Sequence, residues 1–248
     1  MTIEEKIQEL QKIIDGTDNI VFFGGAGVST ESGIPDFRSK DGLYHQKYDY
    51  PPETILSHSF FMHHTAEFYK FYRDKILVDG IKPNRAHLKL AELEKAGKLK
   101  AVVTQNIDGL HQDAGSEIVY ELHGSVLRNH CMECGDFFDV DYMKDKENWE
   151  DGVPRCGRCG GAIKPDVVLY EEGLDSVTIQ GAVEAISQAD VLIIGGTSLV
   201  VYPAAGLVDY FHGSKLVLLN KGTTARDGSA DLVIDAPIGE VLGAIVVR

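Results

Sequence analysis

The sequence has few cysteines, no long apolar stretch and no basic leader segment. Four of its 248 residues are cysteines, and a chain of this length buries about three quarters of its unfolded surface, so it needs no disulfide bonds to fold. No stretch approaches the roughly 18–20 apolar residues of a membrane-spanning helix. The N-terminal segment is acidic and amphipathic, unlike a secretory signal peptide. We therefore expect a cytoplasmic protein without membrane contact, in a compartment where thiols stay reduced.

Positive charge is also scarce. The chain has 24 Lys and Arg residues against 38 Asp and Glu residues, which gives a net charge of −14. Proteins that bind the phosphate backbone of nucleic acids need Lys and Arg to release counterions, so the composition argues against direct nucleic-acid binding. An acidic surface favours basic partners, such as Lys-rich protein segments, although it can also serve solubility alone.

Short apolar runs recur along the chain, and each ends in a polar or Gly-rich cluster. Such runs are typical of strands that are buried on both faces of a parallel sheet, and the expected strands are 20–23, 100–103, 118–122, 191–194 and 216–219. Helical periodicity predicts helices over 2–15, 84–96 and 176–189. Alternating strands and helices indicate a doubly wound α/β sheet, in which ligands bind beyond the carboxyl ends of the strands.

Two stretches interrupt this alternation. Residues 39–82 are rich in aromatic side chains, which suggests a loop followed by helices, and residues 124–165 hold all four cysteines and many charges. We expect both to be insertions that pack together as a smaller lobe, while residues 1–38, 83–123 and 166–248 form a nucleotide-binding lobe.

The four cysteines form two C-x-x-C pairs. Cys131 and Cys134 make the first pair and Cys156 and Cys159 the second; at this spacing four thiolates can surround Zn²⁺, and neighbouring glycines permit the tight turns. A thioredoxin-like redox pair is the alternative, but it needs one such motif at a helix N-terminus after a strand. We therefore predict one structural zinc ion, because four thiolates leave no position open for water.

A Gly-rich turn follows the first expected strand. Gly25, Ala26 and Gly27 would let backbone N–H groups approach a pyrophosphate at the end of that strand. Thr30 stands where a dinucleotide-binding fingerprint has its third glycine, and no strand-end acid follows about twenty residues later. The turn by itself indicates either a tight connection between elements or a nucleotide site.

Polar residues follow two further expected strands. Asn106 and Asp108 come after the second strand, where they either cap a turn or hold the polar edge of a ligand. His123 comes after the third strand, immediately before Gly124. It is either a structural histidine or a general base, since an imidazole titrates near neutral pH.

These motifs together resemble the sirtuin family of NAD-dependent protein lysine deacylases. Residues 25–38, GAGVSTESGIPDFR, resemble the first signature of that family along its full length. The other motifs follow in the family's order: TQNID at 104–108, His123-Gly124, the two cysteine pairs, GTSL at 196–199 with Pro203, and Asn220. The resemblance covers residues 20–238 and is greatest to the compact bacterial members.

The resemblance implies a Rossmann-like lobe that binds NAD and a smaller zinc-bearing lobe, with acyl-lysine entering from the other side. His123 would be the general base, and Asn106, Ile107 and Asp108 would shape the nicotinamide pocket, with Asn106 and Asp108 taking part in catalysis. The full set implied to contact NAD is Gly25, Ala26, Gly27, Thr30, Phe37, Arg38, Gln105, Asn106, Ile107, Asp108, His123, Gly196, Thr197, Ser198, Asn220, Lys221 and Ile238.

The resemblance also implies the reaction. NAD would be consumed as an electrophile, with release of nicotinamide and transfer of the acyl group from lysine to ADP-ribose. His123 would accept a proton from a ribose hydroxyl, and a desolvated pocket would protect the reacting groups from water. We therefore expect a monomer that acts on acyl-lysine proteins or peptides and that is no oxidoreductase.

Two other functions remain open. The same NAD site would serve a mono-ADP-ribosyltransferase if a protein nucleophile replaced water and the acyl group. A non-enzymatic NAD-sensing or zinc scaffold is the other alternative, although a scaffold needs none of His123, Asn106 and Asp108 together.

Two segments depart from the family's pattern. The run KPDVVLYEE stands where many members have a phenylalanine pair followed by Gly-Glu. The backbone of Val167, Val168 and Leu169 would still pair with an extended substrate, but the lining of the acyl tunnel would change. Members that prefer acidic acyl groups have a Tyr and, three residues later, an Arg. Here Tyr69 is followed by Tyr72, so no guanidinium would bind a succinyl carboxylate, and we expect acetyl or another neutral acyl group.

Overall fold

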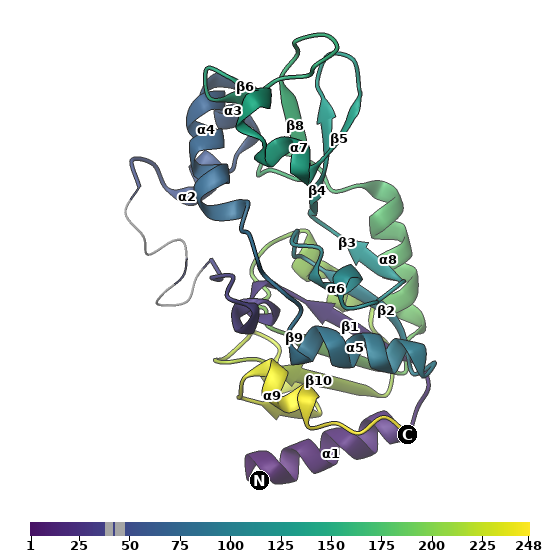
Figure 1. Ribbon diagram of the computed structural model, residues 1–248. Helices are drawn as coiled ribbons and strands as arrows, with labels where there is room; N and C mark the ends of the chain where they lie inside the picture. Colours follow the sequence, from purple (N-terminus) through teal and green to yellow (C-terminus); the bar gives the residue numbers. More distant parts are fainter. Residues whose placement is uncertain (38–41, 43–47) are drawn as a thin grey trace.

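The computed structural model describes residues 1–37, residue 42 and residues 48–248. Its centre is a six-stranded parallel sheet with the strand order β11-β10-β9-β1-β2-β3 (Figure 1). The order reverses between β1 and β9, and ligand sites of open α/β sheets form at such switch points. The strands are β1 Ile20–Gly24, β2 Leu99–Thr104, β3 Val119–Glu121, β9 Val191–Gly195, β10 Lys215–Leu219 and β11 Leu232–Ile234.

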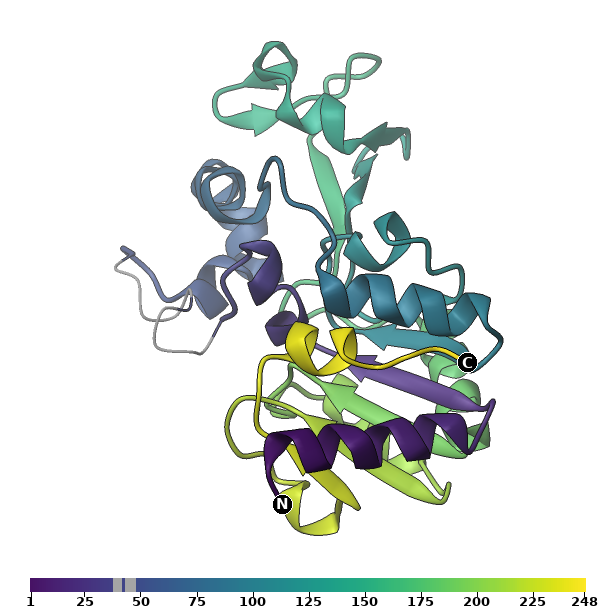
Figure 2. The same cartoon turned by 60° about the horizontal axis from the view of Figure 1, so that its bottom comes forward.

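Helices cover both faces of this sheet. On one face lie α1 Ile3–Asp15, α5 Arg85–Lys95 and α9 Ile238–Gly243 (Figure 2), and on the other lie α8 Ser176–Gln188 and the 3₁₀ helix η6 Ala204–Tyr210. Helix α1 begins with a reciprocal pair of capping hydrogen bonds. The Glu5 N–H donates to Thr2 Oγ1 over 3.2 Å, and the Thr2 N–H donates to Glu5 Oε2 over 2.8 Å.

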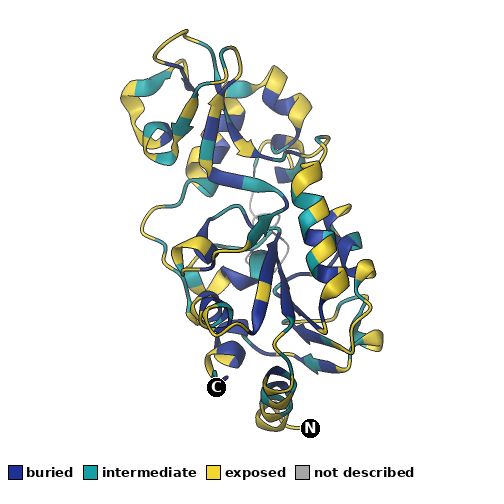
Figure 3. Ribbon diagram, turned by 90° about the vertical axis from the view of Figure 1, so that its right-hand side faces the viewer, coloured by how far each residue is buried: buried dark blue, intermediate teal, exposed yellow. Residues whose placement is uncertain are grey.

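Successive side chains of β1 enter opposite hydrophobic cores. Ile20 and Phe22 pack with residues of α1, α5 and α9, whereas Val21 and Phe23 pack with residues of α8 and η6. All four side chains are fully buried, as expected for a central strand that is covered on both faces. Figure 3 shows the same pattern for the large sheet, whose strands are mostly dark blue, while the outer side of α8 is yellow.

The segment that holds the cysteines forms a separate antiparallel sheet with the order β5-β4-β8. Its strands are β4 Gly124–Cys131, β5 Phe137–Asp139 and β8 Ile163–Val167. A two-stranded ribbon and two short helices complete this module: β6 Trp149–Glu150, β7 Val153–Pro154, α7 Val140–Lys144 and the 3₁₀ helix η5 Lys146–Asn148.

The aromatic-rich insertion forms short consecutive helices: α2 Pro52–Ile55, α3 His58–His63, α4 Thr65–Phe71 and the π-helical turn η4 Tyr72–Ile76. Its buried rings share one core with side chains of the cysteine module, including Met143 and Ile163. The Phe68 and Tyr72 rings stack with centroids 5.5 Å apart, and the Tyr69 hydroxyl donates to the carbonyl of Ile163. The two insertions therefore form one smaller lobe beside the large sheet (Figure 1).

The predicted fold class is confirmed, although several short elements were not predicted. Strand β11 has only three residues between Asp231 and Asp235, so no apolar pattern marked it, and its parallel pairing with β10 defines it. The other unpredicted elements are η1 Ala26–Val28, η2 Thr30–Ser32, α6 Leu110–Asp113, η6, η7 Asp227–Ser229 and helix α9, together with the strands and helices of the cysteine module. In the part of the chain that the structure describes, no helix combines the length and the apolarity that a membrane span requires.

Candidate active site

The carboxyl ends of the parallel strands open into one cavity of about 720 Å³. Residues from the ends of β1, β2, β3, β9 and β10 line it together with residues of the smaller lobe. Arg38 lies outside the described residues. Every other residue predicted to contact NAD or the substrate strand lines this cavity: Gly25, Ala26, Gly27, Thr30, Phe37, Gln105, Asn106, Ile107, Asp108, His123, Val167, Val168, Leu169, Gly196, Thr197, Ser198, Asn220, Lys221 and Ile238.

The Gly-rich turn after β1 lies directly against the end of β9. The Gly27 N–H donates to the carbonyl of Gly196 over 2.8 Å. A Cβ on Gly27 would lie 2.8 Å from Gly196 Cα, and a Cβ on Gly25 would lie 2.8 Å from Thr197 Cβ. The two backbones approach so closely that no side chain fits between them. The turn therefore presents main chain at the switch point, which is the kind of surface that a pyrophosphate binds.

Ser29 connects the two polar residues that follow β2. Its hydroxyl donates to Asp108 Oδ2 over 2.6 Å and accepts a hydrogen bond from Asn106 Nδ2 over 3.0 Å. Asp108 Oδ1 accepts from the Leu110 N–H over 3.0 Å. One oxygen of Asp108 therefore caps a turn, as the simpler interpretation expected, and the other belongs to a buried polar cluster on the cavity wall.

His87 of α5 lies behind this cluster. The Asn84 N–H donates to His87 Nδ1 over 3.2 Å, so the neutral ring carries its proton on Nε2, which lies 3.5 Å from Ser29 Oγ. Burial lowers the pKa of His87 to about 4. The neighbouring His111 ring, whose centroid is 4.8 Å away, has its pKa lowered by burial to about 3. Both imidazoles are therefore neutral, and His87 is the one that lies next to Ser29 of the cluster.

His123 lines the cavity just beyond the end of β3. Its Nδ1 lies 2.9 Å from the carbonyl oxygen of Gln105. A carbonyl oxygen only accepts, so Nδ1 carries the proton and Nε2 keeps its lone pair. Burial lowers the pKa of His123 below 6.5, and the hydrogen bond to Gln105 opposes this only in part. The imidazole is therefore neutral near physiological pH and can accept a proton.

The opposite half of the cavity is built at the ends of β9 and β10. Gln105 Nε2 donates to Thr197 Oγ1 over 3.1 Å, which connects this half to the segment after β2 that holds Asn106. Asn220 Nδ2 donates to the carbonyl of Gly222 over 3.2 Å. Ile238 is only 4% exposed and belongs to the hydrophobic core beneath. Polar groups thus stand around an apolar floor, an arrangement that suits an adenosine.

The wall on the side of the smaller lobe consists of Val167, Val168 and Leu169. Val167 ends strand β8, which pairs with β4. The Val168 N–H donates to the carbonyl of His123 over 2.9 Å, and the Leu169 N–H donates to Glu172 Oε2 over 2.9 Å. This segment is therefore hydrogen-bonded to the main chain of His123, the residue that can act as a base.

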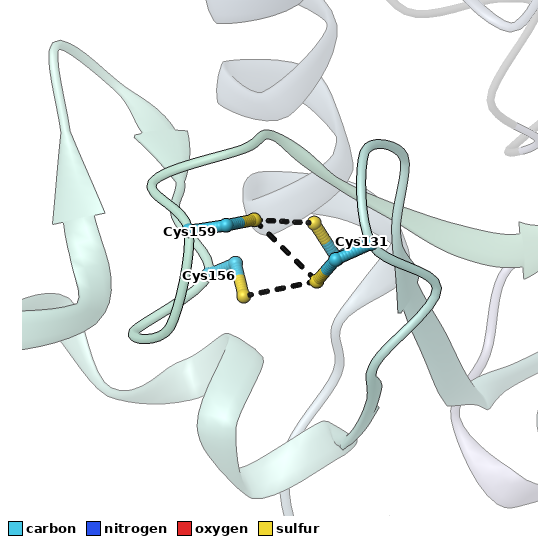
Figure 4. A group of neighbouring side chains, drawn as sticks. Cys131, Cys156 and Cys159 are labelled. Carbon is cyan, nitrogen blue, oxygen red and sulfur yellow. Dashed lines mark hydrogen bonds between the residues drawn. The ribbon is translucent and has the colours of Figure 1, made fainter.

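The four cysteines meet in the smaller lobe, and Figure 4 labels three of them, Cys131, Cys156 and Cys159. Their Sγ atoms all lie within 4.8 Å of one another: Cys159 Sγ is 3.4 Å from Cys131 Sγ and 3.4 Å from Cys134 Sγ, and Cys134 Sγ is 3.7 Å from Cys156 Sγ. Two sulfurs bound tetrahedrally to zinc at about 2.3 Å lie about 3.8 Å apart. The cluster therefore fits the single structural zinc ion that was predicted, and none of its residues lines the cavity.

Some residues of the site were not identified from the sequence. Ser29 lies inside the segment that resembles the sirtuin signature, and this was the only signal available for it. His87 occupied one position of a predicted helix, where nothing marked it as a neighbour of the cavity. Glu171 lies in the segment that departs from the family's pattern and lines the cavity. Tyr72, by contrast, was singled out from the sequence, and its hydroxyl is buried beside the cavity without a hydrogen-bond partner in the described chain.

Comparison with known proteins agrees with this geometry. The sequence profile of the Sir2 family matches residues 25–203. An NAD-dependent protein deacetylase of Clostridium acetobutylicum is 60% identical over 99% of this chain and 100% of its own length. A second one, from Clostridium perfringens, is 58% identical over 98% of this chain and 100% of its own length.

Solved structures give the same result. A structure that describes the mechanism and regulation of Sir2 enzymes superimposes with a TM-score of 0.87 at 41% identity, covering 98% of this chain and 97% of that one. A Sir2 complex with a p53 peptide and NAD⁺ superimposes with a TM-score of 0.83 at 40% identity, covering 95% of each chain. The chain therefore belongs to the Sir2 family, the sirtuins.

Proposed function

We propose that this protein is an NAD-dependent protein lysine deacetylase. Its substrates are NAD, water and an acyl-lysine side chain, and its products are lysine, nicotinamide and an acylated ADP-ribose. When bound, NAD supplies the electrophilic ribose carbon that nicotinamide leaves. The observation that carries the proposal is the position of His123, which has an unprotonated Nε2 and shares one cavity with the Gly-rich turn and with Val167–Leu169.

The residues around the cavity fit NAD in three parts. The close approach of Gly25 and Gly27 to β9 leaves no room for a side chain where the pyrophosphate would lie, and their own N–H groups donate to Gly195 and Gly196. The cluster of Asn106 and Asp108 offers the buried amide and carboxylate groups that a carboxamide requires, and Ile107 adds an apolar wall. We assign the ribose and adenosine contacts to the remaining lining residues: Ala26, Thr30, Phe37, Gln105, Gly196, Thr197, Ser198, Asn220, Lys221 and Ile238, with Arg38 adjacent in the sequence.

His123 acts in this proposal as the general base. The carbonyl of Gln105 holds the proton on Nδ1, so Nε2 is the atom that accepts a proton from a ribose hydroxyl. The lowered pKa keeps the ring unprotonated before that step. Burial of the ring also limits access of bulk water to the reacting groups.

The substrate peptide would pair with Val167, Val168 and Leu169 as an added strand. Main-chain pairing selects peptides that adopt an extended conformation, and the acyl-lysine side chain is then free to enter the cavity. The net charge of −14 would favour the approach of Lys-rich segments. We assign residues 1–38, 83–123 and 166–248 to the NAD-binding lobe and residues 39–82 and 124–165 to the smaller lobe that closes the cavity.

The zinc ion has a structural role in this proposal. Cys131, Cys134, Cys156 and Cys159 occupy all four positions of a tetrahedral site, so the metal would cross-link two turns of the smaller lobe. Thiolates persist in a reducing compartment, which supports a cytoplasmic location. We further propose a monomer that binds no nucleic acid directly, which sedimentation and a DNA-binding assay would test.

The acyl preference follows from the residues that line the smaller-lobe side. Tyr72, rather than an arginine, lies beside the cavity with a buried hydroxyl. A succinyl carboxylate would lose its hydration there beside a neutral phenol, without the bidentate hydrogen bonds of a guanidinium. We therefore expect faster turnover of acetyl-lysine than of succinyl-lysine peptide, and the reverse order would contradict this.

One experiment tests the central proposal. The protein is incubated with an acetyl-lysine peptide and with or without NAD, and peptide and nucleotide products are followed by mass spectrometry. His123→Ala should abolish the reaction, whereas His130→Ala, a change at an exposed histidine outside the cavity, should not. Deacetylation that proceeds without NAD, or that survives the loss of His123, would refute the mechanism.

The same spectra examine the alternative function. A mono-ADP-ribosyltransferase would add the mass of ADP-ribose to a protein or peptide instead of removing an acetyl group. The position of Val167–Leu169 beside His123 favours deacetylation, because it places an extended chain next to the base. A predominantly ADP-ribosylated product would instead favour the transferase function.

A further inference from the structure

Glu171 and Glu172, which end the segment proposed to pair with the substrate, are both bound to the first turn of α3. The Ser59 N–H donates to Glu171 Oε2 and the Ser59 hydroxyl donates to Glu171 Oε1, each over 2.9 Å. His58 Nδ1 lies 2.8 Å from Glu172 Oε1. These contacts connect residues more than 110 positions apart in the chain, so they join the wall of the cavity to the helical insertion.

Glu171 has a backbone conformation that favours glycine. Its φ is +78°, in the left-handed region where the Cβ of an L-residue lies too close to the neighbouring carbonyl. The carboxylate is exposed, so burial of the side chain does not explain why a residue other than glycine occupies this position. The two hydrogen bonds from Ser59 offset the unfavourable φ of Glu171. The one from the Ser59 N–H is the larger cause of the lowered pKa of Glu171. The side chain is therefore ionised and bound.

Glu172 holds the other end of the same segment. Its Oε2 accepts from the Leu169 N–H over 2.9 Å and from Lys164 Nζ over 3.2 Å. Lys164 Nζ also donates to the carbonyl of Val167 over 3.0 Å. Burial raises the pKa of Glu172, but these hydrogen bonds outweigh it and the pKa is lowered overall. The Glu172 carboxylate thereby holds the Leu169 N–H directly and the Val167 carbonyl through Lys164.

The main chain itself joins α3 at the residue between these ends. The Tyr170 N–H donates to the carbonyl of Leu56 over 3.0 Å, and the His58 N–H donates to the carbonyl of Tyr170 over 2.9 Å. These two bonds form a short parallel bridge between the segment and the turn before α3. Residues 167–172 are therefore held at nearly every position, although they leave the regular strand β8 at Val167.

We propose that Glu171 and Glu172 are positioning residues for the acyl-lysine substrate. Together they clamp residues 167–170 against α3, so that the main chain is already ordered when a peptide arrives. The inference rests on the proposed function, because it requires that the peptide lies along Val167–Leu169. The Val168 N–H is bound by His123 and the Leu169 N–H by Glu172, so a peptide pairs there through the main-chain carbonyl oxygens, which can accept a second hydrogen bond. A wall ordered in advance lowers the entropic cost of binding. Neither carboxylate touches the groups proposed for the chemical step, so the clamp acts on peptide binding alone.

A double-mutant cycle on Glu171 and Ser59 tests the clamp. We expect Glu171→Ala and Ser59→Ala each to raise KM for an acetyl-lysine peptide roughly three- to tenfold. We expect KM for NAD and kcat to change by less than about twofold in both variants, and the double variant to match Glu171→Ala. Glu171→Gln keeps an acceptor for the Ser59 hydrogen bonds and should restore most of the peptide KM.

Controls separate the clamp from loss of structure. Glu67→Ala removes an exposed carboxylate from α4 of the same module and should leave every constant unchanged. The melting temperature of each variant, from circular dichroism, shows whether it is folded at the assay temperature. Glu172→Gln should also raise the peptide KM, and it provides a second test if Glu171→Ala folds poorly.

The outcomes distinguish this inference from the proposed function. An active wild-type enzyme whose peptide KM is unaffected in Glu171→Ala and in Glu172→Gln would overturn the clamp and leave the deacetylase proposal intact. Fully additive effects of Glu171→Ala and Ser59→Ala would also overturn it. A folded wild-type protein that fails to deacetylate the peptide with NAD would remove both proposals.

Discussion

The Ser29 hydroxyl donates to Asp108 Oδ2 over 2.6 Å, although the two residues are 79 positions apart in the chain. The same hydroxyl accepts from Asn106 Nδ2, so its proton is directed at Asp108. His87 Nε2 lies 3.5 Å from Ser29 Oγ. One serine thus orients the carboxylate and the amide that we assign to the nicotinamide end of NAD.

Ser29→Ala should impair catalysis and also lower the stability of the fold. The change removes the donor to Asp108 Oδ2 and the acceptor of Asn106 Nδ2. A buried polar group without its partner costs about 1–3 kcal/mol, so we expect kcat/KM for NAD to fall roughly 10- to 100-fold. Steady-state kinetics measure this, with Ser187→Ala on exposed α8 surface as the control. A Ser29→Ala enzyme within about twofold of wild type would show that the cluster does not position NAD.

The pH profile should report the state of His123. Burial lowers its pKa below 6.5, and only the neutral ring can accept a proton at Nε2. Activity should therefore be constant around neutral pH and fall as the pH drops through that lowered pKa. The measurement is kcat/KM against pH, under conditions where the protein stays folded. His130→Ala should keep this acidic limb, and a midpoint above 6.5 would contradict the assignment of the base.

His111 should make the fold less stable in acid. Its pKa is lowered by burial to about 3, whereas an unfolded histidine titrates near 6.5, so the unfolded state binds the extra proton below that pH. Stability then falls as the pH drops below about 6.5, by up to about 1.4 kcal/mol per pH unit. Neither ring nitrogen of His111 has a partner among the described residues, so a phenylalanine loses no hydrogen bond there.

His111→Phe should therefore flatten the pH dependence of stability. Urea unfolding of both proteins at about pH 7.5 and about pH 5 should show a loss in wild type that exceeds the loss in the variant by up to about 2 kcal/mol. His130→Phe, at an exposed position, provides the matched control and should behave as wild type. Equal losses in His111→Phe and wild type would mean that His111 does not stay neutral in the fold.

Removal of zinc should destabilise the smaller lobe. The four sulfurs lie close enough for one ion, and the binding energy of a structural zinc is also folding energy. Chelation, or Cys159→Ser at the exposed ligand, should lower the melting temperature, with activity lost as the lobe unfolds. Metal content is measured by atomic spectroscopy in parallel. Zinc-free protein that remains folded and fully active would contradict the structural role.

Much of the architecture is encoded in short windows of sequence. The run around Phe22 is apolar at every position because β1 is covered on both faces, and this alone predicted a buried parallel strand. The C-x-x-C pairs predicted their metal because each pair already sets two ligands at a fixed spacing. His123 stood out because it directly follows a strand, and parallel strands bring their carboxyl ends to one edge.

The sequence alone thus determined most strands of the sheet and the zinc ligands, since periodicity and spacing are local properties, and the resemblance to the sirtuin motifs supplied most of the residues that surround the cavity. Only the tertiary structure decided which of these residues touch. The contact of Ser29 with Asp108 and that of Ser59 with Glu171 span 79 and 112 positions, and no local pattern relates their partners. Strand order and the packing of the two insertions bring them within hydrogen-bond distance, and hydrogen bonds depend on distances that sequence spacing does not encode.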